Sequence, residues 1–190
     1  YQGAQYPWES ADDGTEQCPD WTIEPDGTCY RCYVAVYEHH VTAAVAYGIY
    51  NYVRITHDTE FLLHKGAEIL IETARFWKSR LQYIKDNDRY EIHRVTGPDE
   101  WHEPVDNNVY TNYLARWNLR YVTALTEMLS SEYPQEYTAL VEKLGLTEEE
   151  IADWDAVAAK VYLPRKEGTQ LLEQFEGYFD LKEAVIEKYD

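Results

Sequence analysis

The sequence predicts an all-α fold, and three observations carry this prediction. Apolar residues recur at spacings of three and four over much of the chain, as they do on one face of an α-helix. Residues typical of helix starts stand directly before several of these stretches. Of the 190 residues, 45% are hydrophobic and 15% are aromatic, which is ample for a buried core. Because no linker or change in composition divides the chain, we expect one domain or a large piece of one.

Residues 1–32 have the composition of a loop, with Pro, Gly, Asp and Ser spread along them. Within this loop, residues 12–16 have some character of a calcium loop, but the ligand spacing is incomplete and we interpret them as a solvated turn. The first long helix is expected over 34–55, where small and apolar residues keep a helical spacing. A Glu-His-His triplet, residues 38–40, lies near its start.

A second helix is expected after a short link. Asp58 or Thr59 can cap its start, and apolar residues keep a helical spacing as far as Trp77. Only a few residues separate this helix from the first, so the two should form an antiparallel helical hairpin. The segments 81–84 and 90–95 then alternate in hydrophobicity around a turn-rich tetrapeptide. They predict a short β-hairpin.

The second long helix is expected over 108–130, with Asp106, Asn107 or Asn108 as its N-cap. Both long helices begin beside loops that carry polar motifs, so their N-termini should open toward a common site with the shorter helices outside. This is the layout of an α/α toroid. The apolar face of the second long helix comprises Tyr110, Leu114, Trp117, Tyr121, Leu125 and Met128.

Shorter helices complete the predicted order. One is expected over 134–144, because a proline opens it. Another is expected from 147 to about 162, where Thr147 and Glu150 form a capping box. An aromatic loop at 174–179 follows, and a short, weak helix to residue 190 is expected at the end.

The stretch 97–112 gathers carboxylates, an imidazole and amides directly before the second long helix, so chemistry is sought here first. Glu100 lies between Trp101 and a rigid Gly-Pro turn, and we interpret it as a partly desolvated carboxyl that can serve as a general acid. The positive end of the helix dipole would hold Asp106 ionised. The alternative interpretation is an N-capped helix that follows an acidic surface loop.

Composition also bears on the partners. Lys and Arg total 17 against 35 Asp and Glu, a formal net charge of -18, which repels phosphate backbones and anionic lipids. We therefore expect neither a nucleic acid nor a membrane as partner. The 18 Tyr and 6 Trp suit a carbohydrate site, because aromatic rings stack on the apolar faces of sugars. With no long apolar run and no pattern of a signal peptide, we expect a cytoplasmic protein.

The three cysteines are Cys18, Cys29 and Cys32, and the last two have a C-x-x-C spacing. An odd number argues against a pure disulfide framework, and a single C-x-x-C is a weak zinc signal. We expect reduced, structural cysteines and no metal. The nearby His39 and His40 leave a metal site conceivable.

The string from Gly97 to Asn112 closely resembles the signature of glycoside hydrolase family 65, which holds maltose, kojibiose, nigerose and trehalose phosphorylases. The segments 3–10 and 174–179 resemble other parts of the same family, so the resemblance covers nearly the whole chain. It implies an (α/α)6 barrel preceded by a β-sandwich. We therefore expect residues 1–190 to be a fragment of one catalytic domain, without its flanking segments and without the N-terminal β-sandwich.

The resemblance implies an activity for the full-length enzyme. Glu100 is expected to act as general acid in the inverting phosphorolysis of an α-linked glucose disaccharide of the maltose, kojibiose, nigerose or trehalose type, which yields glucose 1-phosphate and glucose. Inorganic phosphate is then a co-substrate and no cofactor is needed. A homodimer is expected for the full-length enzyme, and no activity for the fragment alone. Alternatives are an inverting hydrolase of the same fold, such as a trehalase or a glucoamylase-like enzyme, and an inactive sugar-binding fragment.

Five further residues are expected to contact the substrate. Four of them also have a structural alternative: Trp8 can fill a hydrophobic gap, Glu9 can cap a turn, His102 can order the loop and Asn108 can cap the helix. As a fragment of a toroid, the chain should also leave apolar stripes in need of cover, namely Leu63, Leu70 and Trp77, and Leu114, Trp117 and Tyr121. The expected substrate contacts are Trp8, Glu9, His102, Glu103 and Asn108.

Overall fold

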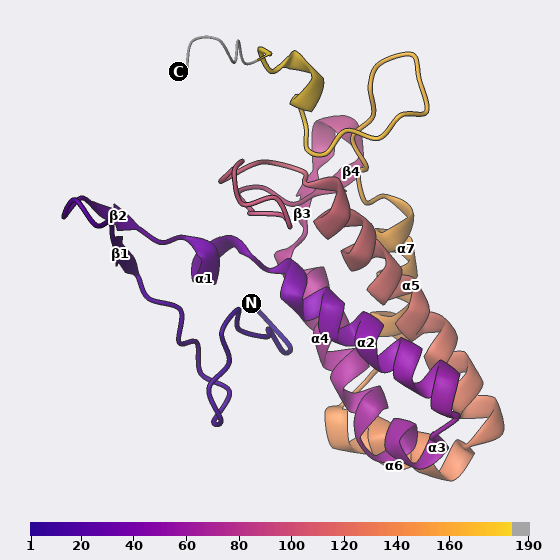
Figure 1. Cartoon of the computed structure of the whole chain (residues 1–190). Helices are drawn as coiled ribbons and strands as arrows, with labels where there is room; N and C mark the ends of the chain where they lie inside the picture. Colours follow the sequence, from indigo (N-terminus) through magenta and orange to yellow (C-terminus); the bar gives the residue numbers. More distant parts are fainter. Residues whose placement is uncertain (184–190) are drawn as a thin grey trace.

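The computed structural model describes residues 1–183, and within them a helical body carries irregular segments at one end (Figure 1). The expected C-terminal helix lies largely outside the described residues. The strands are β1 (Trp21–Ile23), β2 (Cys29–Arg31), β3 (Gln82–Ile84) and β4 (Arg89–Glu91). The helices are α1 (Val34–Tyr37), α2 (His40–Thr56), α3 (Thr59–Phe61), α4 (Ala67–Arg80), α5 (Val109–Glu132), α6 (Pro134–Leu144) and α7 (Glu148–Ala159), with a π-helical turn at Leu62–Gly66 and 3-10 turns at Lys85–Asn87 and Tyr178–Asp180.

The two long helices α2 and α5 pack against each other and run in the same direction, with neighbouring N-termini (Figure 1). Helices α4 and α7 return in the opposite direction and pack against α5. Parallel long helices with antiparallel partners are the alternation that the sequence predicts. The predicted direction of the two long helices is therefore confirmed.

The core forms where α2, α4, α5 and α7 meet. Its largest fully buried side chains include Trp77 of α4, Leu119 of α5 and Trp154 of α7. Leu70 and Trp77 are 0% exposed, so the expectation that their stripe needs cover from elsewhere is wrong. The reason is that α5 and α7 already cover α4. Leu63, Leu114, Trp117 and Tyr121 are only partly buried.

The first long helix is interrupted, contrary to the expectation of one helix over 34–55. Helix α1 ends at Tyr37, Glu38 has a non-helical ψ of 60°, and α2 begins at His40. The Tyr37 carbonyl accepts hydrogen bonds from the backbone N–H groups of His39 at 3.0 Å and Thr96 at 3.1 Å. In a continuous helix, the Tyr37 carbonyl would accept a hydrogen bond from within the helix. Here it accepts one from Thr96 of a distant loop instead.

Residues 1–32 are not all loop, because β1 and β2 pair antiparallel with Trp21 opposite Arg31. Gly27 lies at the turn with a φ of 87°, a conformation that favours glycine. The Asp26 carboxylate accepts the Thr28 N–H at 2.8 Å. An Asp-Gly turn signal was thus present in the sequence. Each strand, however, is only three residues long and has no buried residue, so the sequence lacks the alternation that marks a half-buried strand.

Strands β3 and β4 pair antiparallel, with Gln82 opposite Glu91, and lead the chain into the polar stretch 97–112. Helix α7 ends at Ala159, earlier than expected. The residues that follow pair with β4 instead: Tyr90 N–H donates to the Lys160 carbonyl and Tyr162 N–H to the Tyr90 carbonyl, both at 2.9 Å. No helix in the part of the chain that the structure describes is long and apolar enough to cross a membrane.

Candidate active site

The acidic loop, residues 96–108, is closed at its base by two hydrogen bonds. Val95 and Val105 exchange backbone N–H and carbonyl groups, each at 2.9 Å. The loop therefore leaves the end of the β3–β4 pair and returns to it before α5 begins. This closure holds Glu100 at the N-terminal ends of α2 and α5, where the sequence places the site.

Asn108 is the N-cap of α5. This is the structural role that the sequence offered as an alternative to a substrate contact. Its Oδ1 accepts hydrogen bonds from the Thr111 N–H at 3.0 Å and hydroxyl at 3.1 Å, and its Nδ2 donates to the Gln174 carbonyl at 3.3 Å. A Cβ added to Gly97 would lie 2.2 Å from this Nδ2. Glycine is therefore required there, because any side chain would displace the capping amide.

Beneath the loop lies a buried polar network around Asn107 that the sequence analysis did not single out. Asn107 is 0% exposed; its Nδ2 donates to Glu176 at 2.7 Å and to Glu91 at 3.2 Å. Its Oδ1 accepts the Ile92 N–H at 3.2 Å and the Asn112 amide at 3.1 Å. A buried polar side chain with all these hydrogen bonds holds its surroundings in one geometry. Asn107 therefore fixes the base of the acidic loop.

The aromatic loop predicted at 174–179 packs against the acidic loop. Gln174 Nε2 donates to Asp99 at 2.5 Å, and the rings of Phe175 and His102 lie 5.1 Å apart. Asp99 also contacts His102 Nδ1 at 2.8 Å. Hydrogen bonds from His102, Gln174 and the Trp101 N–H lower the pKa of Asp99, so this carboxylate is ionised and orients the imidazole.

Glu100 is exposed at the outer end of the loop, and the neighbouring Trp101 is 94% exposed. Glu38 lies at the break between α1 and α2, with a side chain that is 0% exposed. Within the described chain, no N–H or O–H group donates to either Glu38 oxygen. Burial, together with the negative charges of Glu100 and Glu103, raises the pKa of Glu38 to about 8.

His40 joins this cluster from the first turn of α2. Its Nε2 lies 3.9 Å from Glu38 Oε2, and its ring faces Trp8 at 6.0 Å and Tyr110 at 5.8 Å between centroids. Burial lowers the pKa of His40, against an opposing effect of Glu100, so the ring is neutral near pH 7. Trp8 thus lies beside the first turn of α2, and Glu100 is near enough for its charge to act on His40, although the three are distant in sequence.

The segment that carries Trp8 and Glu9 is held by one carboxylate. Glu16 accepts the backbone N–H groups of Trp8 at 2.6 Å, Glu9 at 2.9 Å and Cys18 at 2.9 Å. Trp8 is 38% exposed and Glu9 is exposed, so both side chains are accessible. Glu16 thus holds the backbone of Trp8 and Glu9 in place, and these hydrogen bonds do not involve the side chains of the two residues.

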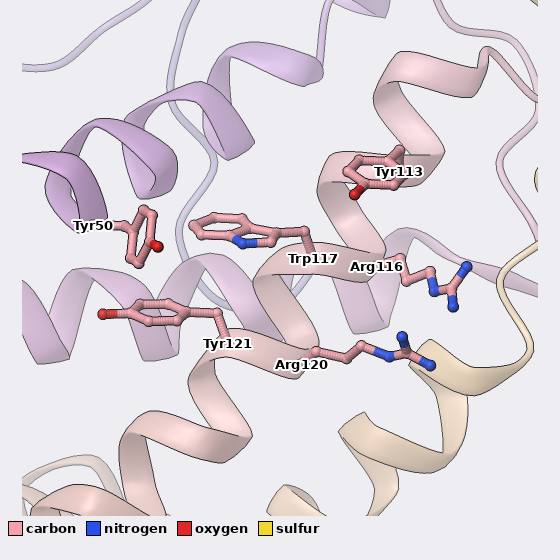
Figure 2. Close-up of a pocket in the computed structure, with 6 residues that line it drawn as sticks. All are labelled: Tyr50, Tyr113, Arg116, Trp117, Arg120 and Tyr121. Atoms are coloured by element: carbon pink, nitrogen blue, oxygen red, sulfur yellow. The ribbon is translucent and has the colours of Figure 1, made fainter. Parts of the chain in front are cut away.

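An aromatic cavity of about 360 Å³ lies between α2 and α5, further along both helices (Figure 2). The rings of Trp117 and Tyr121 stack at 5.3 Å with an interplanar angle of 5°, and Tyr50 of α2 meets both edge-on. Arg116 and Arg120 line the other side. Aromatic side chains of the kind that suits a carbohydrate site therefore line this cavity, but Glu100 does not.

The cysteines form no metal site in the described residues, which contain no group of three or more His, Cys, Asp or Glu suited to an ion. All three are free thiols, with 3.7 Å between the sulfurs of Cys18 and Cys32. Residues 12–16 form a turn in which Asp13 accepts the Thr15 N–H at 3.0 Å and hydroxyl at 2.7 Å.

The structure brings most of the predicted site residues to one end of the helical body. Trp8 packs against His40, whose pKa responds to the charge of Glu100, and His102 lies on the acidic loop. Glu103 lies on the same loop, where it accepts the Thr96 hydroxyl at 3.3 Å. Asn108 lies beneath them and is 3% exposed. The sequence analysis missed Glu38 as a site residue, although the Glu-His-His triplet beside a helix start was a signal for it.

Comparison with known proteins assigns the class. The whole chain, residues 1–190, matches the model of the glycosyl hydrolase family 65 central catalytic domain. The chain belongs to this family, as the resemblance in its sequence predicts.

Relatives and a solved structure agree with this assignment. The chain is 51% identical over 190 residues to the kojibiose phosphorylase of Thermoanaerobacter brockii, covering 100% of this chain and 24% of that protein. It is 37% identical to the 1,2-α-glucosylglycerol phosphorylase of Bacillus selenitireducens, covering 99% and 25%. A solved structure from the human microbiome, provisionally described as a kojibiose phosphorylase, matches with a TM-score of 0.79 at 27% identity, covering 98% and 25%. The chain thus spans about a quarter of the length of these proteins.

Proposed function

We propose that the full-length protein catalyses inverting phosphorolysis of an α-linked glucose disaccharide, of the maltose, kojibiose, nigerose or trehalose type. The observation that carries this proposal is the position of Glu100, which is accessible on a braced loop at the N-terminal ends of α2 and α5. At the start of α2, Trp8 and Tyr110 pack around His40, on which the charge of Glu100 acts. Membership of glycosyl hydrolase family 65, together with the similarity of the chain to several phosphorylases, supports it.

In the proposed reaction, the Glu100 carboxyl gives its proton to the glycosidic oxygen as the bond to the anomeric carbon breaks. A phosphate oxygen attacks that carbon from the opposite face and forms the new bond, so the configuration inverts. The products are glucose 1-phosphate and a free sugar, and Glu100 is left as a carboxylate. Phosphate is the nucleophile, so no catalytic carboxylate base and no metal or other cofactor is required.

The remaining predicted residues have distinct proposed roles. Trp8 offers a partly exposed ring on which a sugar face can stack, and Glu9, His102 and Glu103 offer polar groups for hydroxyls. Asp99 holds the His102 ring in place, so His102 can meet a hydroxyl without first being ordered. Asn108 caps α5 with its side-chain oxygen, and we propose that it serves the site mainly by holding the acidic loop in place.

We further propose that residues 1–190 are part of one (α/α)6 catalytic domain within a longer polypeptide that also carries a β-sandwich. The full-length protein is proposed to be a cytoplasmic homodimer that binds its disaccharide and phosphate and neither nucleic acid nor membrane. The net charge of -18 supports the last point.

Glu100→Gln in the full-length protein is expected to abolish phosphorolysis while leaving sugar binding largely intact, because the amide keeps the shape but has no acidic proton. General acid catalysis contributes roughly 10²- to 10⁴-fold. The measurement is release of a sugar 1-phosphate from a panel of disaccharides, with and without phosphate.

Three outcomes would argue against parts of this proposal. A Glu100→Gln enzyme with activity within a few-fold of the parent would remove Glu100 from the role, and Glu103 would be examined next. Release of free glucose alone, independent of phosphate, would identify a hydrolase. No turnover of any disaccharide by the full-length parent, with sugar binding retained, would point to a binding protein.

A further inference from the structure

Two of the three cysteines meet at the base of the β1–β2 hairpin. The Cys18 and Cys32 sulfurs lie 3.7 Å apart, and both residues are partly buried. A disulfide bond joins two sulfurs at about 2.0 Å. The two sulfurs are therefore in contact as free thiols, and only a short further approach separates them from a covalent bond.

Backbone hydrogen bonds hold both cysteines in this position. Strands β1 and β2 pair antiparallel, and Cys32 continues the pairing just beyond β2, where its N–H donates to the Asp20 carbonyl at 2.8 Å. The Cys18 N–H donates to the Glu16 carboxylate at 2.9 Å. Each cysteine thus has its own backbone partner, and the contact between the sulfurs follows from how the hairpin closes.

The C-x-x-C spacing points to a different pair, Cys29 with Cys32, but the geometry of the strand separates these two side chains. Cys29 lies on β2 opposite Ile23, three residues before Cys32. Side chains alternate between the two faces of a strand, so an odd separation places them on opposite faces. Cys29 is also exposed, whereas Cys18 and Cys32 are not. The fold therefore selects Cys18 as the partner of Cys32.

We infer that Cys18 and Cys32 are an oxidisable dithiol: a small-molecule disulfide, such as oxidised glutathione, converts them to one intramolecular disulfide that closes residues 18–32 into a loop. One cysteine thiol gives its proton to water, and its sulfur attacks the small disulfide, which forms a mixed disulfide and releases one small thiolate. The other cysteine loses its proton and attacks the bonded cysteine sulfur, and the second small thiolate leaves. Both released thiolates take up protons. The two cysteine sulfurs are oxidised, and the small disulfide is reduced to two thiols.

The surroundings of the pair make this reaction slow near neutral pH. Burial and the contact with Cys32 raise the pKa of Cys18 to about 11, so Cys18 is a protonated thiol near pH 7. The thiolate is the reacting form of a cysteine, so the disulfide should form faster at about pH 9 than at about pH 7.

The disulfide fastens the segment that carries Trp8 and Glu9 to the start of the helical body. Glu16, which accepts the Cys18 N–H, also accepts the backbone N–H groups of Trp8 and Glu9. Cys32 lies two residues before α1. A disulfide restricts the open forms of the loop that it closes, so the hairpin should open less often once the bond has formed. The dithiol itself does not depend on the proposed phosphorolysis.

The experiment treats the full-length protein with oxidised glutathione, blocks the remaining thiols by alkylation and maps the peptides by mass spectrometry without reduction. Digestion after Glu24 and Arg31 places the three cysteines on separate peptides. The expected product is one cross-link between the peptides that contain Cys18 and Cys32, with the loss of two hydrogens. Cys29→Ser is the matched control and should form the same link, whereas Cys18→Ser should not form it.

A second measurement follows the opening of the hairpin. Glu24 is exposed between the two cysteines, and cleavage of the native protein after Glu24 by a glutamate-specific protease should slow severalfold when the parent is oxidised. Cys18→Ser should be cleaved at the same rate with and without oxidised glutathione.

Four outcomes would overturn the inference. The first three are a link between Cys29 and Cys32, separate glutathione adducts on Cys18 and Cys32 with no link, and no reaction of either cysteine with an excess of the oxidant. The fourth is an unchanged rate of cleavage after Glu24 in protein that carries the link, because the bond would then not close the hairpin.

Discussion

Two buried glutamates illustrate how surroundings decide the behaviour of one residue type. Glu91 is 5% exposed and pairs with Arg89 at 2.6 Å, with His93 and with Asn107. Burial alone would raise the pKa of Glu91, but the hydrogen bonds from these partners outweigh burial and lower it. Glu38 is buried as deeply and has no such donors, and its pKa is raised to about 8. The ionised Glu91 carboxylate braces the acidic loop from below, whereas the Glu38 carboxyl favours its protonated form.

These opposite shifts predict opposite effects of pH on stability. The folded state binds the Glu38 proton more tightly than the unfolded chain does, so the contribution of Glu38 to stability falls as the pH rises from 4.5 toward about 8. Glu91 has the opposite effect because its pKa is lowered. Its contribution to stability is present above pH 4.5, the ordinary pKa of a glutamate, and is lost on acidification. Denaturant unfolding of the parent and of each Gln variant between pH 4 and 9 measures both effects.

Glu38→Gln should therefore be stabilised relative to the parent at about pH 8, with the difference shrinking toward pH 4.5. Glu91→Gln should be destabilised at neutral pH. Equal stability of the parent and Glu38→Gln at every pH would mean that Glu38 reaches water in the folded protein, and burial would not raise its pKa.

At the scale of elements, helical spacing in the sequence predicted the helices and their directions well. It could not predict the break at Glu38, because Thr96, which takes the Tyr37 carbonyl, is far away in sequence. The early end of α7 has the same kind of cause, since Lys160 and Tyr162 pair with Tyr90. In both cases a long-range backbone hydrogen bond overrides local propensity. The motif points to Glu100 as the candidate acid, an assignment that stays a prediction, whereas Glu38 lies outside the motif and only the fold shows that it is buried at the helix break.

Replacement by alanine should change the stability of the protein in opposite directions at two glycines, Gly48 in α2 and Gly97 in the acidic loop. Gly48→Ala replaces a helical glycine with nothing within 4 Å of the added Cβ, so it should stabilise by about 0.5 to 1 kcal/mol. Gly97→Ala places the Cβ 2.2 Å from the Asn108 amide and should displace the α5 cap, whose loss alone costs about 1 kcal/mol. Thermal unfolding measures both. A stabilising Gly97→Ala would show that the acidic loop does not depend on this close packing.

At the scale of the whole molecule, the two apolar stripes that were expected to need cover have different fates. The stripe that contains Leu70 and Trp77 is buried by this chain's own helices. The stripe that contains Trp117 and Tyr121 instead borders an open aromatic cavity between α2 and α5 (Figure 2). A neighbouring hollow of about 700 Å³ shares Tyr50 and Trp117 and extends to Tyr110. The aromatic face is thus continuous with the end that carries the candidate site.

Large exposed apolar patches are rare on monomers. The aromatic face that contains Trp117 and Tyr121 should therefore bind another apolar surface when the 190-residue chain is studied alone. We expect self-association in sedimentation, or binding of a hydrophobic dye. Tyr47→Lys with Tyr113→Lys, at residues that are 45% and 54% exposed on this face, should reduce either signal. Ile23→Lys, at a residue 72% exposed on β1 and away from this face, is the control and should not. A compact monomer that binds no dye would mean that the chain closes its own core, and the proposal that it is part of a larger toroid would have to be abandoned.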